Sequence, residues 1–135
     1  MEHQVVLRKK IFSVDGSLAW NKSHSQLPVV INIKDSIFRI FYSTRDSQQK
    51  SRPSFFDYDV SNDIVVNENK KGPLLELGPP GSFDDSGVMP TEIVKLKNKY
   101  YMYYIGWSIK KNVDYHNSIG LAVSHDCTNF KKLFD

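Results

Sequence analysis

Two adjacent carboxylates with aromatic residues close behind them are the feature of this chain with the clearest potential for chemistry. Asp84 and Asp85 lie in a short acidic loop that leads through Gly87 into a strand, and the aromatic strand after it ends at Trp107. Carboxylates accept hydrogen bonds from hydroxyl groups and can transfer protons, and aromatic faces stack on sugar rings. The stretch therefore favours a site for sugar chemistry.

Each of these carboxylates also has a structural alternative. A like-charge pair raises the pKa of one member, which suits a general acid or a group that tunes one. Equally, Asp84 or Asp85 could only cap the turn before Gly87. Glu92, two residues into the following strand, could face the same site or could be paired with a lysine.

Further residues could contact a substrate. His24, just before Pro28, could bond a sugar hydroxyl or tune a carboxylate, or it could hold a loop. Trp107 and Trp20 could stack on a sugar or pack in a core, and Trp107 is the better candidate because it lies at a strand end.

Two arginines flank one polar loop. The guanidinium groups of Arg45 and Arg52 could bind substrate hydroxyls or an acidic sugar. The alternative is that they form ion pairs with Asp46 and Asp57, which lie nearby in the sequence.

Composition indicates one folded domain and argues against several functional classes. Of the 135 residues, 40% are hydrophobic and 24% are charged, which is enough apolar material for a core. The net charge is +3 and the lysines form scattered pairs, so a nucleic-acid partner is not expected. Cys127, the single cysteine, has no partner at metal-ligand spacing, so we expect no metal and no cofactor. No apolar run is long enough for a signal peptide or a membrane span, so we expect a cytoplasmic protein with no membrane partner.

Short strands rich in β-branched and aromatic residues follow one another, and their order repeats. Pro28 and Pro90 each open a strand and lie 62 residues apart. Each is followed by a strand, a polar turn, a second strand, a polar loop and a third strand, and residues 44–50 and 108–116 are the two loops. Tandem four-stranded meanders are typical of β-propeller blades. Strands are expected near residues 29–34, 37–43, 53–60, 64–66, 91–96, 100–107 and 118–124, with a last strand from 130.

Because no stretch has a helical period with caps, we predict an all-β fold of antiparallel four-stranded blades, about two of them, in separate sheets. Residues 1–27 are the expected N-terminal segment, 28–72 the first blade, 73–89 a connector and 90–135 the second blade, all within a single domain. Two blades do not close a ring, so the chain should be a partial propeller. Its open flanks should lead to self-association or to marginal stability.

Four segments carry a family resemblance. They read WNKSHSQLP from Trp20, IFYSTRD from Ile40, FDDSGVMP from Phe83 and SIGLAVSHD from Ser118. In this order and spacing the chain resembles the N-terminal part of the five-bladed β-propeller glycosidases, the superfamily that holds glycoside hydrolase families 32, 43, 68 and 130. The resemblance covers nearly the whole chain.

The resemblance implies a central funnel lined by the innermost strand of each blade. Glycoside hydrolysis needs two carboxyl groups across the scissile bond, one as acid and one as base or nucleophile. The predicted catalytic residues are Asp84, Asp85 and Glu92, and the predicted substrate-binding residues are His24, Arg45, Arg52 and Trp107.

The sequence departs from the family pattern in two ways. The place of the first-blade aspartate, beside the opening proline, reads Ser25-Gln26-Leu27, and the blade that would supply a glutamate is absent. We therefore expect a glycoside hydrolase-like protein, acting on the glycosidic bonds of a carbohydrate, that is incomplete as a catalyst unless further blades or a partner chain complete it. The alternative is a non-catalytic carbohydrate-binding or assembly module.

Overall fold

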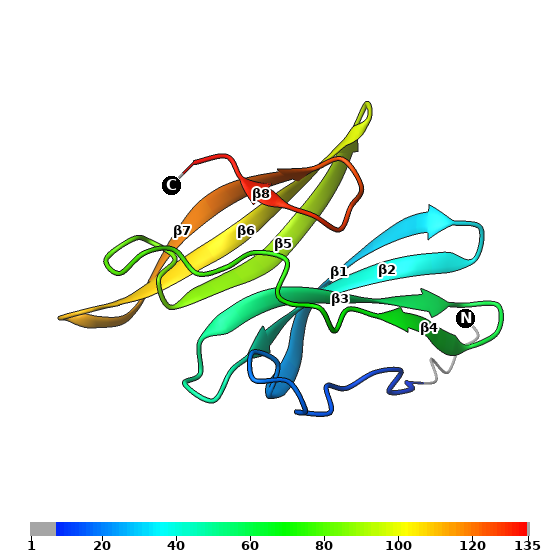
Figure 1. Ribbon diagram of the computed structural model, residues 1–135, viewed down its shortest axis with the longest axis horizontal. Coiled ribbons are helices and arrows are strands. Elements are labelled where there is room, and N and C mark those ends of the chain that lie inside the picture. The colour runs from blue at the N-terminus through cyan, green and yellow to red at the C-terminus, as the bar shows by residue number, and fades with distance from the viewer. Residues whose placement is uncertain (1–7, 135) are drawn as a thin grey trace, which may run out of the picture.

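The computed structural model describes residues 8–134, and within that range it is all-β, with no helix (Figure 1). Residues 1–7 and 135, which belong to the predicted N-terminal segment and second blade, lie outside the described residues. Because the described part has no helix, it has none that could cross a membrane. The strands are β1 (Ser23–Lys34), β2 (Ile37–Arg45), β3 (Ser51–Asp59), β4 (Ile64–Glu68), β5 (Gly87–Leu96), β6 (Lys99–Lys110), β7 (Val113–Ser124) and β8 (Lys131–Lys132).

The strands form two consecutive four-stranded antiparallel meanders, as the repeat predicts. The first unit is β1 to β4 and the second unit is β5 to β8, and each strand pairs with the next one in its unit. Figure 1 shows the units side by side, with the connector between β4 and β5 passing across them. β1 contacts β5, so the first strands of the two units are neighbours, as they are in a propeller. The all-β, partial-propeller prediction is confirmed.

Two details of the prediction need correction. The expected polar loop at residues 108–116 is instead the end of a long hairpin, in which Ser108 pairs with His116 and Lys110 with Val113. The tip of this hairpin is exposed on both faces. Its residues therefore lack the alternation of apolar and polar side chains from which a strand is predicted. The expectation of separate sheets is also wrong, because the parallel bridge between Ser51 of β3 and Gly87 of β5 joins all eight strands into one sheet.

The main core lies between the two units. Alternate residues of a strand point to opposite faces, so each unit can direct one row of apolar side chains toward the other. Phe41 and Phe55 of the first unit belong to the same buried cluster as Val88 and Met102 of the second, and Leu75 of the connector joins them. Burial of this shared face stabilises the packing of the units against each other.

A second, smaller core covers the opposite face of the first unit. Ile40, Tyr42 and Phe56 point away from the main core, and Phe12 of the N-terminal segment packs on them. The rings of Phe12 and Phe56 are stacked, with centroids 4.1 Å apart. The N-terminal segment therefore acts as a cover for this sheet face.

A buried ion pair joins the two units at the rim where β1 turns into β2. Arg39 donates from Nε and Nη2 to the two carboxylate oxygens of Asp57, at 2.7 and 2.9 Å. The same guanidinium donates to the carbonyl of Cys127 and to Thr128 in the turn between β7 and β8. Its Cζ lies 3.8 Å from the ring centroid of Phe55. One arginine therefore holds the second unit against the first.

Replacing this arginine should lower the free energy of unfolding, so that the protein unfolds at a lower urea concentration. Arg39→Met leaves the buried Asp57 carboxylate without its counter-charge, which costs about 3–5 kcal/mol of unfolding free energy. Urea denaturation measures the loss. Arg8→Met, at an exposed arginine, is the control and should change stability by less than about 0.5 kcal/mol. Equal denaturation midpoints for the two variants would show that Arg39 does not hold the units together.

The single cysteine should be inert in the folded protein. Cys127 is 3% exposed, and burial raises the pKa of its thiol to about 11. In the unfolded chain the pKa is about 8.5. Between these values the thiol ionises only in the unfolded state. Its contribution to the free energy of unfolding is therefore fully present below about pH 8.5 and falls as the pH rises toward 11. We expect an aromatic disulfide reagent at pH 8 to label Cys127 only after denaturant is added; rapid labelling of the native protein would contradict the burial.

Candidate functional site

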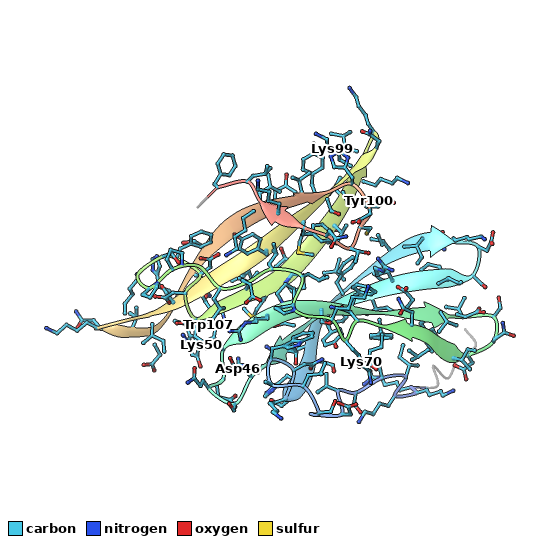
Figure 2. The ribbon with its side chains drawn as sticks, viewed as in Figure 1. Asp46, Lys50, Lys70, Lys99, Tyr100 and Trp107 are labelled. Atoms are coloured by element: carbon cyan, nitrogen blue, oxygen red, sulfur yellow. The ribbon has the colours of Figure 1, made fainter. Side chains whose placement is uncertain are left out.

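A pocket of about 360 Å³ lies at the rim where β2 and β6 end and β1 and β5 begin. We call it the inter-unit pocket, because both four-stranded units contribute to it. Figure 2 labels Trp107, one of its walls, at the junction of the two units. The lining residues are Gln26 and Leu27 of β1, Arg45 of β2, Met89 of β5, Trp107 of β6, and Tyr115 and Asn117 of β7.

The pocket straddles the internal repeat. Leu27 and Met89 are 62 residues apart, and so are Arg45 and Trp107, which is the separation of the two strand-opening prolines. Equivalent positions of the two units therefore face one cavity. This correspondence was present in the sequence and could have identified Leu27 and Met89 as site residues.

Trp107 lies over the bridge between Ser51 and Gly87, where β3 of the first unit meets β5 of the second. A Cβ at Gly87 would lie 1.7 Å from the indole Nε1, so only glycine allows the ring to cover the backbone there. The indole Nε1–H donates to the hydroxyl of Ser51 at 3.1 Å. With 5% of its surface exposed, Trp107 forms a wall of the pocket rather than an open stacking platform.

The start of β1 is irregular, and the irregularity brings two residues to the pocket. His24 and Leu27 have φ values of 68° and 54°, in the left-handed region that side chains with a Cβ rarely adopt. The pairing of β1 with β2 shifts register on both sides of Gln26. Such bulges re-aim side chains and occur near functional sites. Here Gln26 and Leu27 line the cavity, and the Gln26 amide lies 4.0 Å from the sulfur of Met89.

Arg45 is the charged group of the pocket, and its guanidinium has no acceptor among residues 8–134. Its Nε is buried without a hydrogen-bond partner. Its Cζ lies 6.0 Å from the Trp107 ring centroid. The adjacent carboxylate of Asp46 is instead paired with Arg52 at 2.6 Å. The alternative of an ion pair is thus correct for Arg52, whereas Arg45 is unpaired in the described part of the chain.

Tyr115 supplies the open aromatic surface that Trp107 does not. It is 62% exposed and meets the indole edge-on, with ring centroids 5.4 Å apart. Asn117, two residues further along β7, also lines the pocket. The sequence analysis proposes neither residue for the site: Tyr115 falls in the predicted loop 108–116, and Asn117 directly follows that loop.

Asp84 lies outside the pocket lining, and its carboxylate is engaged in hydrogen bonds inside the fold. It is 2% exposed. One carboxylate oxygen accepts hydrogen bonds from Lys132 at 2.6 Å and from the hydroxyl of Tyr104 at 3.3 Å, and the other accepts one from Ser82 at 3.0 Å. These contacts connect the connector, β6 and β8.

Asp85 stands at the same rim but in the connector. Its oxygens accept hydrogen bonds from the Gly81 backbone N–H at 2.8 Å and from the Ser86 hydroxyl at 2.8 Å. These bonds, that of Gly81 first, hold the pKa of Asp85 below its usual value, although partial burial acts in the opposite direction. The expected rise in pKa from a like-charge neighbour does not govern this carboxylate. Asp85 borders a separate cavity of about 460 Å³, together with Lys50.

Glu92 and His24 are also absent from the pocket lining. Glu92 is exposed and accepts a hydrogen bond from the N–H of Ile93. His24 is exposed and its Nδ1 lies 2.8 Å from the hydroxyl of Ser23. His24, Asp84 and Asp85 are therefore not among the residues that line the pocket with Arg45, and their predicted roles stay predictions. Of the predicted site residues, the structure brings Arg45 and Trp107 together.

The arrangement can bind a polar ligand but holds no acid–base pair. None of the residues that line the inter-unit pocket is a carboxylate. Residues 8–134 also contain no group of three or more histidine, cysteine or acidic side chains arranged to hold a metal ion. The pocket offers two amides, a guanidinium and an aromatic surface, and amides both donate and accept hydrogen bonds.

Comparison with known sequences finds longer relatives. No protein-family model matches the chain. The uncharacterized proteins MT1551 (strain CDC 1551 / Oshkosh) and Rv1502 (strain ATCC 25618 / H37Rv) of Mycobacterium tuberculosis are each 35% identical to it over 123 residues. The match covers 91% of this chain and 41% of each relative, so the chain spans less than half the length of these proteins.

Two solved structures share the fold. A glycosyl hydrolase from Bacteroides ovatus matches 90% of this chain and 38% of its own, with a TM-score of 0.66 and 14% identity. Zg3597, a family 117 glycoside hydrolase produced by the marine bacterium Zobellia galactanivorans, matches 97% of this chain and 36% of its own, with a TM-score of 0.64 and 18% identity. The fold of this chain is thus one found in glycoside hydrolases.

The seat of Trp107 can be tested by adding a single methyl group. Gly87→Ala should push the indole out of its place and break its hydrogen bond to Ser51, because no side chain fits beneath the ring. We expect the indole N–H resonance of Trp107 to shift and the thermal midpoint to fall. Gly72→Ala, where a Cβ meets nothing within 4 Å, is the matched control. An unchanged indole resonance in Gly87→Ala would refute this account of the wall.

Proposed function

We propose that this chain is part of a glycoside hydrolase-like five-bladed propeller and that it binds a carbohydrate in the inter-unit pocket. The observation that supports the proposal most directly is the pocket itself. An exposed aromatic ring, two amides and a guanidinium surround one cavity at the rim where the first strands of both units begin. Sugar sites combine such aromatic surfaces with a few polar groups that fix orientation.

Each lining residue has a distinct role in the proposed complex. The Tyr115 ring is 62% exposed and can stack on the apolar face of a sugar. Gln26 and Asn117 can each donate to and accept from ring hydroxyls. The buried wall formed by Trp107 and Met89 limits the depth of the cavity.

Hydrolysis needs more than this pocket supplies. Two carboxyl groups must flank a glycosidic bond, and the pocket lining has none. We therefore propose that the chain holds the carbohydrate and that the missing carboxyl groups come from further blades or from a partner chain. The catalytic roles of Asp84, Asp85 and Glu92 stay predictions.

A non-catalytic carbohydrate-binding module is the second candidate. Gln26 favours it, because this amide lines the pocket beside the opening proline, where the glycosidases that the chain resembles carry an aspartate. An amide can bond a hydroxyl but cannot transfer a proton as a carboxylic acid does.

Removing the exposed ring should test carbohydrate binding. Tyr115→Ala should weaken binding to oligosaccharides by roughly two- to tenfold, because an aromatic contact contributes about 0.5–1.5 kcal/mol. A panel of neutral and acidic oligosaccharides, read by calorimetry, provides the measurement. Tyr103→Ala is the matched control, since Tyr103 is also exposed, at 43%, but does not line the pocket.

The same panel tests the pocket, and an aryl glycoside tests whether catalysis lies elsewhere. No binding by the native chain to any oligosaccharide, or equal affinity in both tyrosine variants, would contradict the proposed pocket. Turnover of an aryl glycoside by this chain alone, abolished in Asp85→Asn, would contradict the division between binding here and catalysis elsewhere.

A further inference from the structure

Three arginines of the first unit lie near or within packed surfaces, and their pairing differs sharply. Arg39 is held by Asp57, and Arg52 is held by Asp46 with Glu76 at 3.4 Å. Arg45 lies between them in sequence but has no hydrogen bond or ion pair from its guanidinium within residues 8–134. The fold therefore satisfies two of these cations and leaves the one in the pocket unpaired.

An unpaired guanidinium is costly unless something else completes it. A buried donor without an acceptor loses its hydrogen bonds to water and gains none in return. The Arg45 Nε is such a donor, and the indole of Trp107, 6.0 Å from Cζ, offers a ring face rather than an acceptor oxygen. Arg45 as a whole residue is half-buried and lines the cavity.

The local charge balance also points to an anionic ligand. Arg45 carries the single formal charge among the residues that line the pocket. Asp46, next to it in sequence, is engaged by Arg52 and by the backbone N–H groups of Gln48 and Lys50. No described carboxylate is therefore directed at Arg45. A ligand that carries an anionic group would meet the positive charge of the guanidinium without competition from a protein carboxylate.

We infer that the inter-unit pocket takes a sugar that carries an oxyanion, either a carboxylate or a sulfate group, and that the Arg45 guanidinium binds this group. The inference rests on the proposed carbohydrate binding and names its ligand class. A planar guanidinium matches two oxygens of such a group with parallel N–H donors. The hydroxyls of the same sugar would meet Gln26 and Asn117, and its apolar face would meet Tyr115.

Three sugars of one configuration test the inference. Galactose, galacturonate and galactose 6-sulfate are titrated separately into the 135-residue chain, and the Arg45 Nε–H resonance, identified by its loss in Arg45→Met, is followed by NMR. We expect the two acidic sugars to bind at least about tenfold more tightly than galactose. The comparison of the two shows which oxyanion is preferred. Their affinity should fall as salt is added.

Variants separate a ligand-binding arginine from a structural one. Arg45→Met should bind all three sugars with the weak affinity of galactose and should unfold at the same or a higher urea concentration, because it removes an unpaired buried donor. Arg45→Lys keeps the charge but not the fork, so it should bind galacturonate more weakly than the native chain. Arg8→Met is the charge-matched control and should bind like the native chain.

The outcomes distinguish the inference from the proposed function. Equal affinity of the native chain for galactose and the acidic sugars would overturn the inference and leave carbohydrate binding in place. Binding of acetate or inorganic sulfate as tight as that of the acidic sugars, or no binding of any sugar, would overturn the proposed function itself. A large loss of stability in Arg45→Met would assign Arg45 to the fold and overturn its role in binding.

Discussion

The seating of one indole ring decides how the two units of this protein meet. Trp107 covers the backbone of Gly87 and donates its N–H to Ser51, and these two small residues form the parallel bridge that joins β3 of the first unit to β5 of the second. Any larger residue at position 87 would collide with the ring. The same indole is also a wall of the inter-unit pocket, so one side chain contributes both to the packing of the units and to the candidate binding site.

The opposite rim is held by a different kind of contact. Arg39 reaches from the first unit to the turn that contains Cys127 and Thr128, and Asp57 neutralises it within the buried surface. An indole lies at one rim and an ion pair at the other, and the apolar cluster between them contains residues of both units. A pocket built from both units depends on these contacts, since binding groups that are already in place lose less entropy on binding.

The acidic loop shows how a residue type can suit two roles. Adjacent aspartates suggested a catalytic pair, yet each carboxylate has partners of its own. Asp84 is buried against Lys132, and Asp85 accepts the Gly81 N–H within the connector. In the described chain they order the segment that leads to Gly87. The polar groups that line the pocket are instead neutral amides and one arginine, which suit recognition of a ligand rather than proton transfer.

The sequence by itself determined most of the strands, their grouping into two units and the all-β class, because alternation of side chains and turn residues are local properties of the chain. The 62-residue repeat even places Arg45 opposite Trp107. It could not decide which charges neutralise one another: Asp57 pairs with Arg39 and Asp46 with Arg52, so Arg45 is left without a partner. Nor could it show that the exposed hairpin carries Tyr115 to the cavity. Ion pairing and pocket walls depend on distances between segments far apart in sequence, and those distances exist only once the two units have packed together.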